Sequence, residues 1–515
     1  MPMEAALVHR FIERHLDEGR AADVAIRTPS RALSYGELAA QVNRVGNALS
    51  ALGVEPEQRV AVLLADGVEL AATFFGALKI GAVPVLLNTR LTADDYRGIL
   101  SDARAKVLVV DEGLAGIALR IQPELPRLGS VLVVGAAPEG LASFERAVAA
   151  ASADLAPEPM SLDDIGFWLY TSGTTGQPKA AIHARRTLLA AEHYGVQVLG
   201  VTRGDRIFAT SKLFFAYALG NALLIPLLTG TETFLHPSWP DVATVVGVAR
   251  EFRPTLLFSV PTFYARLLRD EAPAEAFSSV RLFVSAGERL PAELGLSIER
   301  RLGAPVLDGI GATETIFMFL SNQPDRRRPG ASGVEVPGTE ARILDPDGGP
   351  VAPGERGVLW VKTPSSAVGY WNRVDESRET FAGGWYRTRD VYSRDADGFF
   401  HHHGREDDYF KVAGMWVSPA ALEQVILAHP GVLDAGAVGL PDERGLIKPF
   451  AFIVPRDARA DRDVLCAELE TFVAARVEPH QRLQRIVPVP ELPRTATGKL
   501  QRYKLAALIP QATAK

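Results

Sequence analysis

The chain has 515 residues, enough for roughly three domain-sized units and a large buried core. Its 55 basic and 61 acidic residues leave a net charge of -6, so we expect neither nucleic acid nor an anionic membrane surface as a partner. A composition of 47% hydrophobic and 23% charged residues is typical of a soluble globular protein, and the single cysteine, Cys466, excludes an intramolecular disulfide.

The N-terminal residues and the most apolar stretch both favour a cytoplasmic protein. Charged side chains are spread over the first 19 residues, so these lack the apolar core of a signal peptide. Residues 60–87 are the most apolar, but Asp66, Glu69 and Lys79 interrupt them. Those charges favour a strand, an amphipathic helix and a second strand over a membrane span. With a lone cysteine, a reducing cytoplasm is the expected location.

Helical and strand-like patterns alternate over the first three fifths of the chain. Residues 35–52, which end before Gly53, and residues 67–80 carry apolar side chains at helical spacing. Short apolar runs typical of buried strands occupy residues 59–64, 82–87, 106–110, 165–170, 206–210, 255–259, 282–285 and 306–309. Such alternation favours parallel sheets covered by helices. We therefore predict an α/β fold whose large N-terminal domain contains two parallel-rich sheets.

From about Ala341 the sequence changes to turns and hairpins. Residues 345–349, 353–357 and 394–398 are rich in Asp, Pro and Gly, which is typical of tight turns between antiparallel strands. These predict a small β-barrel subdomain. After Gly404 a charged stretch precedes a compact α+β tail. We predict a domain boundary there, with residues 1–404 as the large domain and residues 405–515 as a mobile α+β C-terminal lid.

A run of hydroxyls and glycines closed by a lysine follows the apolar residues 165–170. It consists of Thr171, Ser172, Gly173, Thr174, Thr175, Gly176, Gln177, Pro178 and Lys179. Glycines let backbone N–H groups turn inward, and hydroxyls and a lysine add further donors, so the run suits a polyphosphate. The spacing is not that of a Walker A loop, because the lysine lies three residues after Gly176 and behind a proline. On the residues alone, phosphate binding and an ordinary loop stay equally open.

The full string resembles the phosphate loop of adenylate-forming enzymes, the superfamily of acyl- and aryl-CoA ligases, adenylation domains and beetle luciferases. Four further motifs in the same order, ending at Lys499, extend this resemblance over essentially the whole chain. The resemblance implies ATP, Mg²⁺ and coenzyme A as co-substrates and cofactor. It implies a nucleotide site made of Thr171, Ser172, Gly173, Thr174, Thr175, Gly176, Lys179, Ala286, Gly287, Glu288, Asp308, Gly309, Ile310, Thr313, Asp390, Arg405 and Lys499.

Residues 308–314, which follow a predicted strand, resemble the superfamily's Tyr-Gly-x-Thr-Glu motif, with Ile310 in place of the tyrosine. Ligands of open α/β sheets bind at the carboxyl ends of strands, and the Glu314 carboxylate is a hard ligand suited to Mg²⁺. The residues alone leave open a strand followed by a helix, with Thr313 near its N-cap. The resemblance implies that Asp308 contacts the adenine amino group, Thr313 an α-phosphate oxygen and Glu314 the magnesium ion.

Three motifs in the second half resemble the ribose, hinge and lysine segments of the superfamily. The two oxygens of the Asp390 carboxylate suit a cis-diol, although Arg389 replaces the expected glycine before it. The resemblance implies that Arg405 reaches the ribose, that Asp407 is the pivot of the lid and that Lys499 bridges the α-phosphate and the substrate carboxylate. By the same resemblance Gly414 lines the pantetheine channel and Arg482 lies near the CoA nucleotide.

The acid-binding residues look most like those of the benzoate-CoA ligase branch. The resemblance implies a pocket lined by Phe215, Ala216, Tyr217, Ala286, Gly311, Ile316 and Phe317. Aromatic rings on several sides suit a flat, short aromatic acid and leave little room for a long alkyl chain. Phe317 stands where benzoate ligases tend to carry a histidine, so a polar ring substituent pointing at it would lose its hydrogen bond. We predict benzoate or a modestly substituted benzoate as the substrate.

The predicted reaction forms aroyl-AMP and then aroyl-CoA, with Lys499, Thr313 and Glu314 as the catalytic residues. Transfer of the aroyl group to the phosphopantetheine of a carrier protein stays open as an alternative, and a luciferase-like oxygenase or a binding protein without activity is disfavoured. A homodimer is expected only because relatives often form one. The run of His401, His402 and His403 leaves a metal site open. On a strand His401 and His403 share one face, but no third ligand is evident, and we expect a strand of amphipathic rings.

Overall fold

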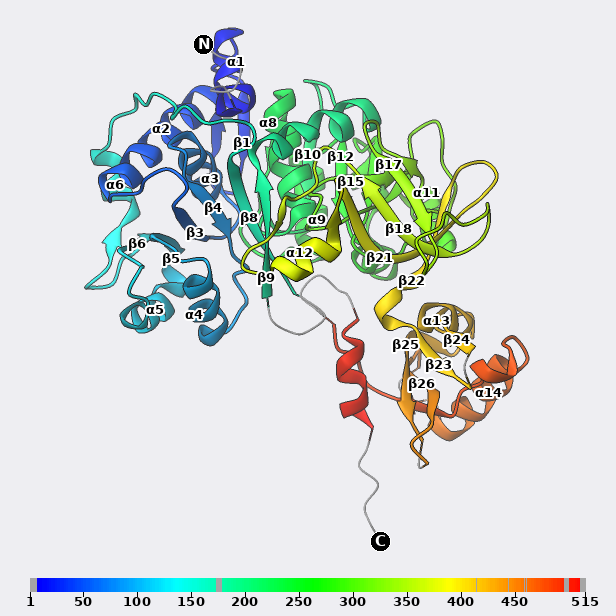
Figure 1. Cartoon of the computed structure of the whole chain (residues 1–515). Helices are drawn as coiled ribbons and strands as arrows, with labels where there is room; N and C mark the ends of the chain where they lie inside the picture. The colour runs from blue at the N-terminus through cyan, green and yellow to red at the C-terminus, as the bar shows by residue number, and fades with distance from the viewer. Residues whose placement is uncertain are drawn as a thin grey trace. The chain divides into compact units, whose positions relative to one another are not determined.

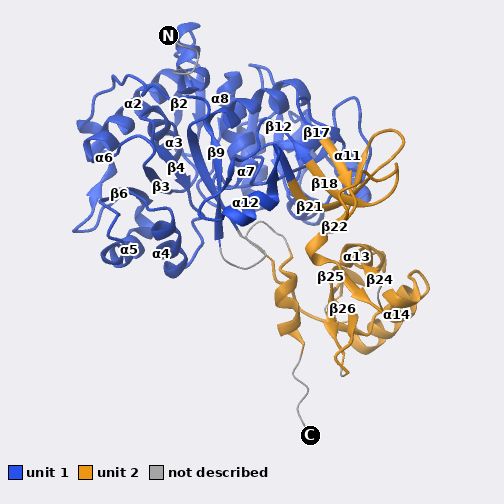
Figure 2. Cartoon of the chain, in the orientation of Figure 1, with its two compact units in different colours: residues 1–340, 361–386 blue, residues 341–360, 387–515 orange. Residues whose placement is uncertain are grey.

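The computed structural model describes residues 7–172, 178–413, 415–442, 444–457, 459, 461–494 and 500–509. The chain forms two compact units, one of residues 1–340 and 361–386 and the other of residues 341–360 and 387–515 (Figure 2). The predicted domain boundary after residue 404 lies within the second unit, and it stays a prediction.

One sheet of the first unit has, in its described residues, the strand order β19-β9-β8-β4-β3-β5-β6-β7 (Figure 1). The strands are β3 Arg59–Leu63, β4 Val83–Leu86, β5 Val107–Asp111, β6 Ser130–Val134, β7 Ala142–Ser143, β8 Ile165–Ser172, β9 Pro178–Ala184 and β19 Gly369–Tyr370. All pairs from β8 to β7 are parallel, and β9 and β19 complete the other edge as antiparallel strands. This confirms one of the two predicted parallel-rich sheets.

The second sheet of this unit has the order β16-β15-β14-β13-β12-β10-β11-β1-β2. Its strands are β1 Val24–Arg27, β2 Ala32–Ser34, β10 Arg206–Ala209, β11 Glu232–Phe234, β12 Leu256–Ser259, β13 Leu282–Ser285, β14 Val306–Gly311, β15 Met318–Ser321 and β16 Val334–Glu335. The pairs from β14 to β1 are parallel, whereas β2, β15 and β16 pair antiparallel at the edges.

The helices of the first unit cover these sheets. They are α1 Arg14–Asp17, α2 Tyr35–Ala51, α3 Val68–Lys79, α4 Ala93–Asp102, α5 Glu112–Ile121, α6 Phe144–Ala150, α7 Ala216–Ala218, α8 Ile225–Thr229, α9 Val242–Glu251, α10 Pro261–Arg269, α11 Ala292–Leu302 and α12 Val374–Thr380. Helices α2 and α3 confirm the two helices predicted from periodicity. Ser34 begins α2 with a capping box, because its hydroxyl accepts from the Glu37 N–H while the Glu37 carboxylate accepts from the Ser34 N–H.

Alternate side chains of each central strand face different cores, which explains why these strands are apolar throughout. In β3, Val60 and Val62 pack in the large core with residues of α2 and α3, whereas Ala61 and Leu63 pack with residues of α4 and α5. In the second sheet Ile207 of β10 joins the same large core, and its neighbour Phe208 packs with residues of α9, α10 and α11. One core is therefore shared by the inner faces of both sheets.

The antiparallel region predicted from about residue 341 is confirmed as a five-stranded sheet with the order β17-β18-β21-β20, in which β22 also pairs with β21. The strands are β17 Glu340–Leu344, β18 Gly357–Lys362, β20 Phe381–Ala382, β21 Trp385–Arg394 and β22 Phe400–Arg405. A tight turn in which the Gly398 N–H donates to the Asp395 carbonyl over 3.0 Å joins β21 to β22. The register places Asp390 opposite Arg405.

The rest of the second unit is a small α+β structure, as predicted for the tail. It contains β23 Phe410–Val412, β24 Met415–Val417, α13 Pro419–Leu427, β25 Val432–Pro441, β26 Ile447–Pro455, α14 Arg462–Ala474 and β27 Arg485–Pro488. Buried apolar residues of α13, α14, β25 and β26 form its own core. Among the residues described, no helix is both long enough and apolar enough to span a membrane.

Candidate active site

Strands β8 and β9 hold the two ends of the predicted phosphate loop. Thr171 and Ser172 are the last residues of β8, and in the antiparallel register Thr171 lies opposite Lys179 of β9. Gly173, Thr174, Thr175 and Gly176 lie outside the described residues. The structure therefore brings both flanks of the motif to one edge of the first sheet, with the Lys179 side chain at the base.

Lys179 has two partners that the sequence did not indicate. Its Nζ lies 2.5 Å from the Oε1 atom of Glu376 on α12, and 3.9 Å from the centroid of the Tyr370 ring. Only 15% of the lysine side chain is exposed, against 33% for the glutamate side chain. A cation over an aromatic face is attracted by the ring quadrupole, so the lysine is held from two sides.

Glu314 is buried in the turn that follows β14, and both of its carboxylate oxygens accept hydrogen bonds from tyrosines. The Tyr370 hydroxyl donates to Oε1 over 2.6 Å, and the Tyr386 hydroxyl donates to Oε2 over 3.3 Å. Burial and the neighbouring Glu314 charge raise the pKa of Tyr370 far above its ordinary value, so its hydroxyl stays a donor. Tyr370 therefore links the predicted phosphate-loop lysine to the predicted magnesium ligand.

The donor set around Glu314 fits Mg²⁺ held together with a nucleotide. Magnesium takes oxygen ligands, keeps several waters and is usually bound by one or two carboxylates plus substrate phosphates. Among the described residues no three His, Cys, Asp or Glu side chains gather closely enough to hold a metal by themselves. The buried carboxylate of Glu314 is a suitable single ligand for such an ion.

His183 of β9, which the sequence did not single out, supports the backbone at Thr313. Its Nε2 donates to the Thr313 carbonyl over 2.9 Å, and its ring stacks on Phe167 at a centroid distance of 4.7 Å. Complete burial lowers the pKa of His183 to about 4, so the ring is neutral near pH 7. The histidine therefore ties the first sheet to the turn that carries Thr313 and Glu314.

The predicted adenine-binding segments lie at the ends of adjacent strands β13 and β14. Ala286, Gly287 and Glu288 follow β13, and Gly287 has a φ of +87°, which favours glycine. The Glu288 carboxylate accepts from the Thr262 hydroxyl over 2.6 Å. Asp308 is buried in β14, and burial raises the pKa of its carboxyl well above the ordinary value. Beside it lies a cavity of about 250 Å³ that is also lined by Leu290, Val306 and Asn322.

Strand β14 is longer than the motif suggested. It continues through Gly309 and Ile310 to Gly311, and residues 312–317 then form a turn into β15, so the alternative of a helix starting near Thr313 is wrong. The reason is the antiparallel pairing of β14 with β15. A Cβ atom at Gly311 would lie 2.7 Å from the Phe317 carbonyl oxygen, so only glycine allows this approach.

The predicted acid-binding residues come together from three parts of the first unit. Phe215 precedes α7, and the hydroxyl of Tyr217 in α7 donates to the Val284 carbonyl of β13 over 2.9 Å, next to the strand that leads to Ala286. The Phe317 ring packs on Gly220, where an added Cβ would lie 2.9 Å from a ring carbon. Ala216, Ile316 and Phe317 are buried in the shared core.

Backbone strain marks this region. Ile316 has a φ of 57°, which is a genuine outlier for a β-branched residue. The turn that holds Ile316 also carries Thr313 and Glu314, so it connects the predicted acid-binding and magnesium-binding residues.

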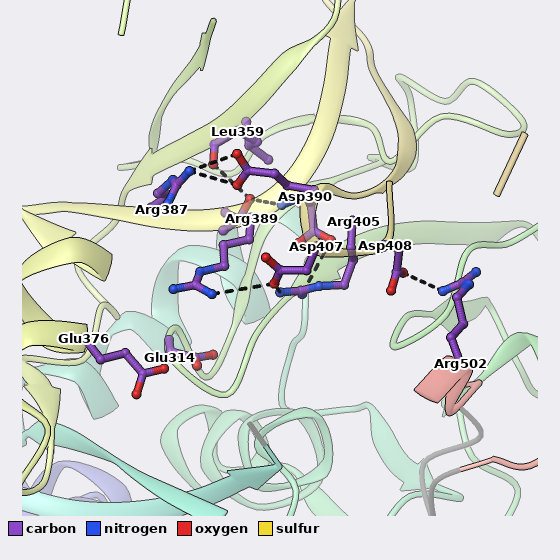
Figure 3. A network of polar contacts seen from close by, with 12 residues as sticks. Glu314, Leu359, Glu376, Arg387, Arg389, Asp390, Arg405, Asp407, Asp408 and Arg502 are labelled. Atoms are coloured by element: carbon purple, nitrogen blue, oxygen red, sulfur yellow. Dashed lines mark hydrogen bonds and ion pairs between the residues drawn. The ribbon is translucent and has the colours of Figure 1, made fainter. Parts of the chain in front are cut away.

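In the second unit, Asp390 of β21 lies beside Arg405 (Figure 3) and also contacts His402. Its Oδ1 is 3.7 Å from Nη1 of Arg405 and 3.4 Å from Nε2 of His402. The Asp390 N–H donates to the Thr388 hydroxyl over 3.0 Å, and this hydroxyl donates to the Leu359 carbonyl over 2.9 Å. These contacts hold the predicted ribose-binding carboxylate and the predicted ribose-contacting arginine side by side.

Arg389, which replaces the glycine of the motif, adopts the backbone conformation that the glycine would permit. Its φ is 61°, in the left-handed region. Its guanidinium lies 3.6 Å from the carboxylate of Asp407, the predicted pivot, and Arg405 lies 3.9 Å from the same carboxylate (Figure 3). Arg389 therefore adopts a left-handed backbone conformation that favours glycine, and its side chain makes an ionic contact.

The neighbouring Asp408 pairs with Arg502, which also contacts Glu423 of α13. Arg502 lies 2.5 Å from Asp408 and 2.8 Å from Glu423. Burial raises the pKa of both carboxyls. Gly414 and Lys499 lie outside the described residues, and Arg482 follows a short helical turn at Pro479–Gln481. Arg502 thus anchors the segment that follows Lys499 in the sequence.

Each of the three histidines of β22 has a partner nearby. His401 lies 2.7 Å from Asp395, His403 lies 2.8 Å from the Ser393 hydroxyl, and His402 contacts Asp390. Their side chains therefore line the β21–β22 ladder on both faces.

Two family models and a curated relative match this chain. The model of the family "AMP-binding enzyme" matches residues 12–371, and that of "AMP-binding enzyme C-terminal domain" matches residues 421–499. The chain is 43% identical over 500 residues to a 4-hydroxybenzoate–CoA/benzoate–CoA ligase of Rhodopseudomonas palustris, covering 96% of this chain and 92% of that protein.

Two solved structures resemble the whole chain. One is an anthranilate CoA ligase in complex with anthranoyl-AMP, at 37% identity and a TM-score of 0.91, covering 98% of each chain. The other is a benzoate CoA ligase from Burkholderia xenovorans LB400, at 38% identity and a TM-score of 0.89, covering 98% of this chain and 99% of that one.

Proposed function

The chain belongs to the AMP-binding enzyme family, in the branch of the benzoate-CoA ligases, and from this premise we propose that it joins an aromatic acid to coenzyme A. It is an AMP-forming acid–thiol ligase that uses ATP to convert benzoate or a modestly substituted benzoate to aroyl-AMP and pyrophosphate. Coenzyme A then converts aroyl-AMP to aroyl-CoA and AMP. The observation that carries this proposal is full-length similarity to such ligases together with Lys179 and Glu314 joined through Tyr370.

The adenylation step requires positioning and charge stabilisation rather than a nucleophilic side chain. An oxygen of the acid's carboxylate attacks the α-phosphorus of ATP, and the bond to pyrophosphate breaks. In this step Thr313 donates to the α-phosphate, while Lys179 and Lys499 balance negative charge on the phosphates. When bound at Glu314, Mg²⁺ supplies further neutralisation of phosphate charge. Asp390 and Arg405 hold the ribose.

The second step uses the C-terminal part of the chain. The thiolate sulfur of coenzyme A forms a bond to the acyl carbon, and the bond between that carbon and the AMP oxygen breaks, which releases AMP. We assign Asp407 as the pivot, Gly414 to the pantetheine channel and Arg482 to the CoA nucleotide. A glycine at 414 suits a channel, because an absent side chain leaves room for a thin ligand arm.

The contacts of Phe317 and Tyr217 favour an apolar ring. The Phe317 ring fills the space over Gly220, and the Tyr217 hydroxyl already donates to the Val284 carbonyl. A ring hydroxyl of the substrate that faced Phe317 would be desolvated without a partner, which costs binding energy. We therefore place benzoate and weakly polar benzoates ahead of hydroxybenzoates as substrates.

The test is AMP release from ATP and Mg²⁺ with a panel of benzoates and fatty acids, each with and without coenzyme A. We expect CoA-dependent turnover that is fastest with a benzoate. A higher kcat/KM for medium-chain fatty acids would refute the aromatic assignment. Pyrophosphate release that stops after about one turnover despite coenzyme A would show a trapped adenylate and favour the alternative acceptor, a carrier-protein phosphopantetheine.

A further inference from the structure

Glu376 pairs with the phosphate-loop lysine at the position where the proposed function places phosphate groups. We propose that Glu376 pairs with Lys179 in the nucleotide-free enzyme, competes with ATP for it, and is displaced by the phosphates of ATP. This inference rests on the proposed function, because it assigns Lys179 to nucleotide binding. It assigns a role in ATP binding to an acidic side chain that lies outside the phosphate-loop motif.

The pair is fixed by the structure on both sides. Lys179 lies in β9, which pairs with β8 and β19, so its backbone position is set by two strands. Glu376 lies in the first turn of α12, which begins after the three residues that follow β19. The Ser377 hydroxyl accepts from the Tyr370 N–H over 2.9 Å and donates to the Arg373 carbonyl over 2.6 Å, so this helical turn is tied to β19. The ion pair is therefore not a contact between two freely moving surface side chains.

The Lys179 ammonium group keeps its contact with the Tyr370 ring when Glu376 is displaced. The Tyr370 ring face lies under Nζ at 3.9 Å, and the hydroxyl of the same ring donates to Glu314. A polyphosphate carries several negative charges against one on the glutamate, so it competes for the same ammonium group. Lys179 can therefore exchange Glu376 for a phosphate oxygen while it stays over Tyr370, on the side of the magnesium ligand.

The exchange has a measurable consequence for affinity. When the binding-competent form is only part of the population, apparent affinity falls by the competent fraction. A partly exposed ion pair contributes only a modest free energy. Competition from such a pair corresponds to about a two- to fivefold change in the dissociation constant of ATP. Removal of the Glu376 charge should therefore tighten ATP binding, which is the opposite of what damage to the site would do.

The experiment measures the dissociation constant of ATP with Mg²⁺ by calorimetry on the full chain, in the absence of acid and coenzyme A. We expect Glu376→Gln to bind ATP about two- to fivefold more tightly than wild type, and to lower KM for ATP without lowering kcat. The matched control is Asp375→Asn, which removes the same charge from the adjacent, 97% exposed side chain of α12. That control should leave the dissociation constant unchanged.

A double-mutant cycle with Lys179→Met assigns the effect to this pair, because Glu376→Gln should then have no effect on ATP binding. An unchanged or weaker affinity in Glu376→Gln, or an equal gain in Asp375→Asn, would overturn the inference and leave the proposed function standing. A wild-type protein that binds no ATP would overturn the proposed function, and this inference with it.

Discussion

Phe317 shows how one side chain can select among aromatic acids. Its ring packs against Gly220, so the space beside it is apolar and closely filled. A histidine at this position would bring a ring nitrogen that can donate or accept a hydrogen bond. We therefore propose that Phe317 sets the preference between apolar and polar ring substituents and leaves the chemistry at the carboxylate unaffected.

We predict that Phe317→His raises kcat/KM for 4-hydroxybenzoate relative to benzoate by about tenfold, the size of one hydrogen bond gained in a buried site. The measurement is kcat/KM for both acids at saturating ATP and coenzyme A. Phe317→Leu is the control, because it changes ring size without adding a polar atom. An equal shift in both variants would mean that space, and not polarity, sets the preference.

His183 predicts a dependence of stability on pH. Its pKa of about 4 in the folded protein lies below the ordinary histidine value of about 6.5, because the ring is completely buried. Between pH 6.5 and pH 4, therefore, His183 is protonated in the unfolded chain but neutral in the folded protein. The stability linked to this group is complete above pH 6.5 and is lost as pH falls toward 4, by up to about 3 kcal/mol.

His183→Gln should flatten this part of the profile, since an amide can still donate to the Thr313 carbonyl but does not titrate. The measurement is the free energy of unfolding in urea at several values from pH 4 to pH 7.5. A wild-type slope in the His183 variant would show that the ring does not stay neutral.

At the scale of elements, Arg502 joins three separate segments of the second unit. It follows the lysine motif in the sequence, and it contacts Asp408 of the hinge motif and Glu423 of α13. Removing one partner of a fully buried ion pair typically costs about 3 to 5 kcal/mol, and we expect a smaller loss here because the three side chains are 13 to 24% exposed. The pairing therefore sets where the lysine-bearing segment attaches to the small α+β structure.

We predict that Arg502→Ala destabilises the second unit, and more so at pH 8 than at pH 5. Burial already raises the pKa of Asp408 and Glu423, and loss of the arginine raises it further. A carboxyl whose folded pKa is raised destabilises the fold when it is ionised, so the loss is relieved as pH falls. Urea unfolding at both pH values measures this, with Arg494→Ala, whose ion pair with Asp434 is about one third exposed, as the control. Equal losses at both pH values would contradict the assignment.

At the scale of the whole molecule, the proposed reaction consists of two successive half-reactions, adenylation and thioester formation. Of the residues we propose for nucleotide binding, Lys179 and Glu314 belong to the first unit, whereas Asp390, Arg405 and Lys499 belong to the second. A two-step reaction on such a chain requires residues that serve one step and not the other. Lys499 is the residue to which we assign the first step alone.

We predict that Lys499→Ala slows adenylation by about two to four orders of magnitude, the range seen when a charge-stabilising group is lost. It should largely keep the conversion of supplied aroyl-AMP and coenzyme A to aroyl-CoA. Pyrophosphate exchange measures the first half-reaction, and thioester formation from synthetic aroyl-AMP measures the second. Equal loss in both would contradict the separation of the two steps.

The sequence by itself determined the elements and the motifs. Apolar periodicity located the strands at residues 59–64 and 282–285 and the helix at residues 35–52 within one or two residues, because burial of a strand or helix face repeats along a local stretch. The motifs from Thr171 to Lys499 resemble those of adenylate-forming enzymes, and that resemblance, not the physical pattern alone, pointed to the superfamily and its benzoate branch.

Only the tertiary structure decided how those motifs are supported. Glu376 lies 197 positions from Lys179, Tyr370 lies 56 positions from Glu314, and His183 lies 130 positions from Thr313, so no local pattern marks these contacts. The extension of β14 to Gly311 could not be predicted for the same reason, because pairing with β15 sets where the strand ends. Local repetition encodes which face of an element is buried, but a contact between distant side chains exists only once the sheets have paired and stacked.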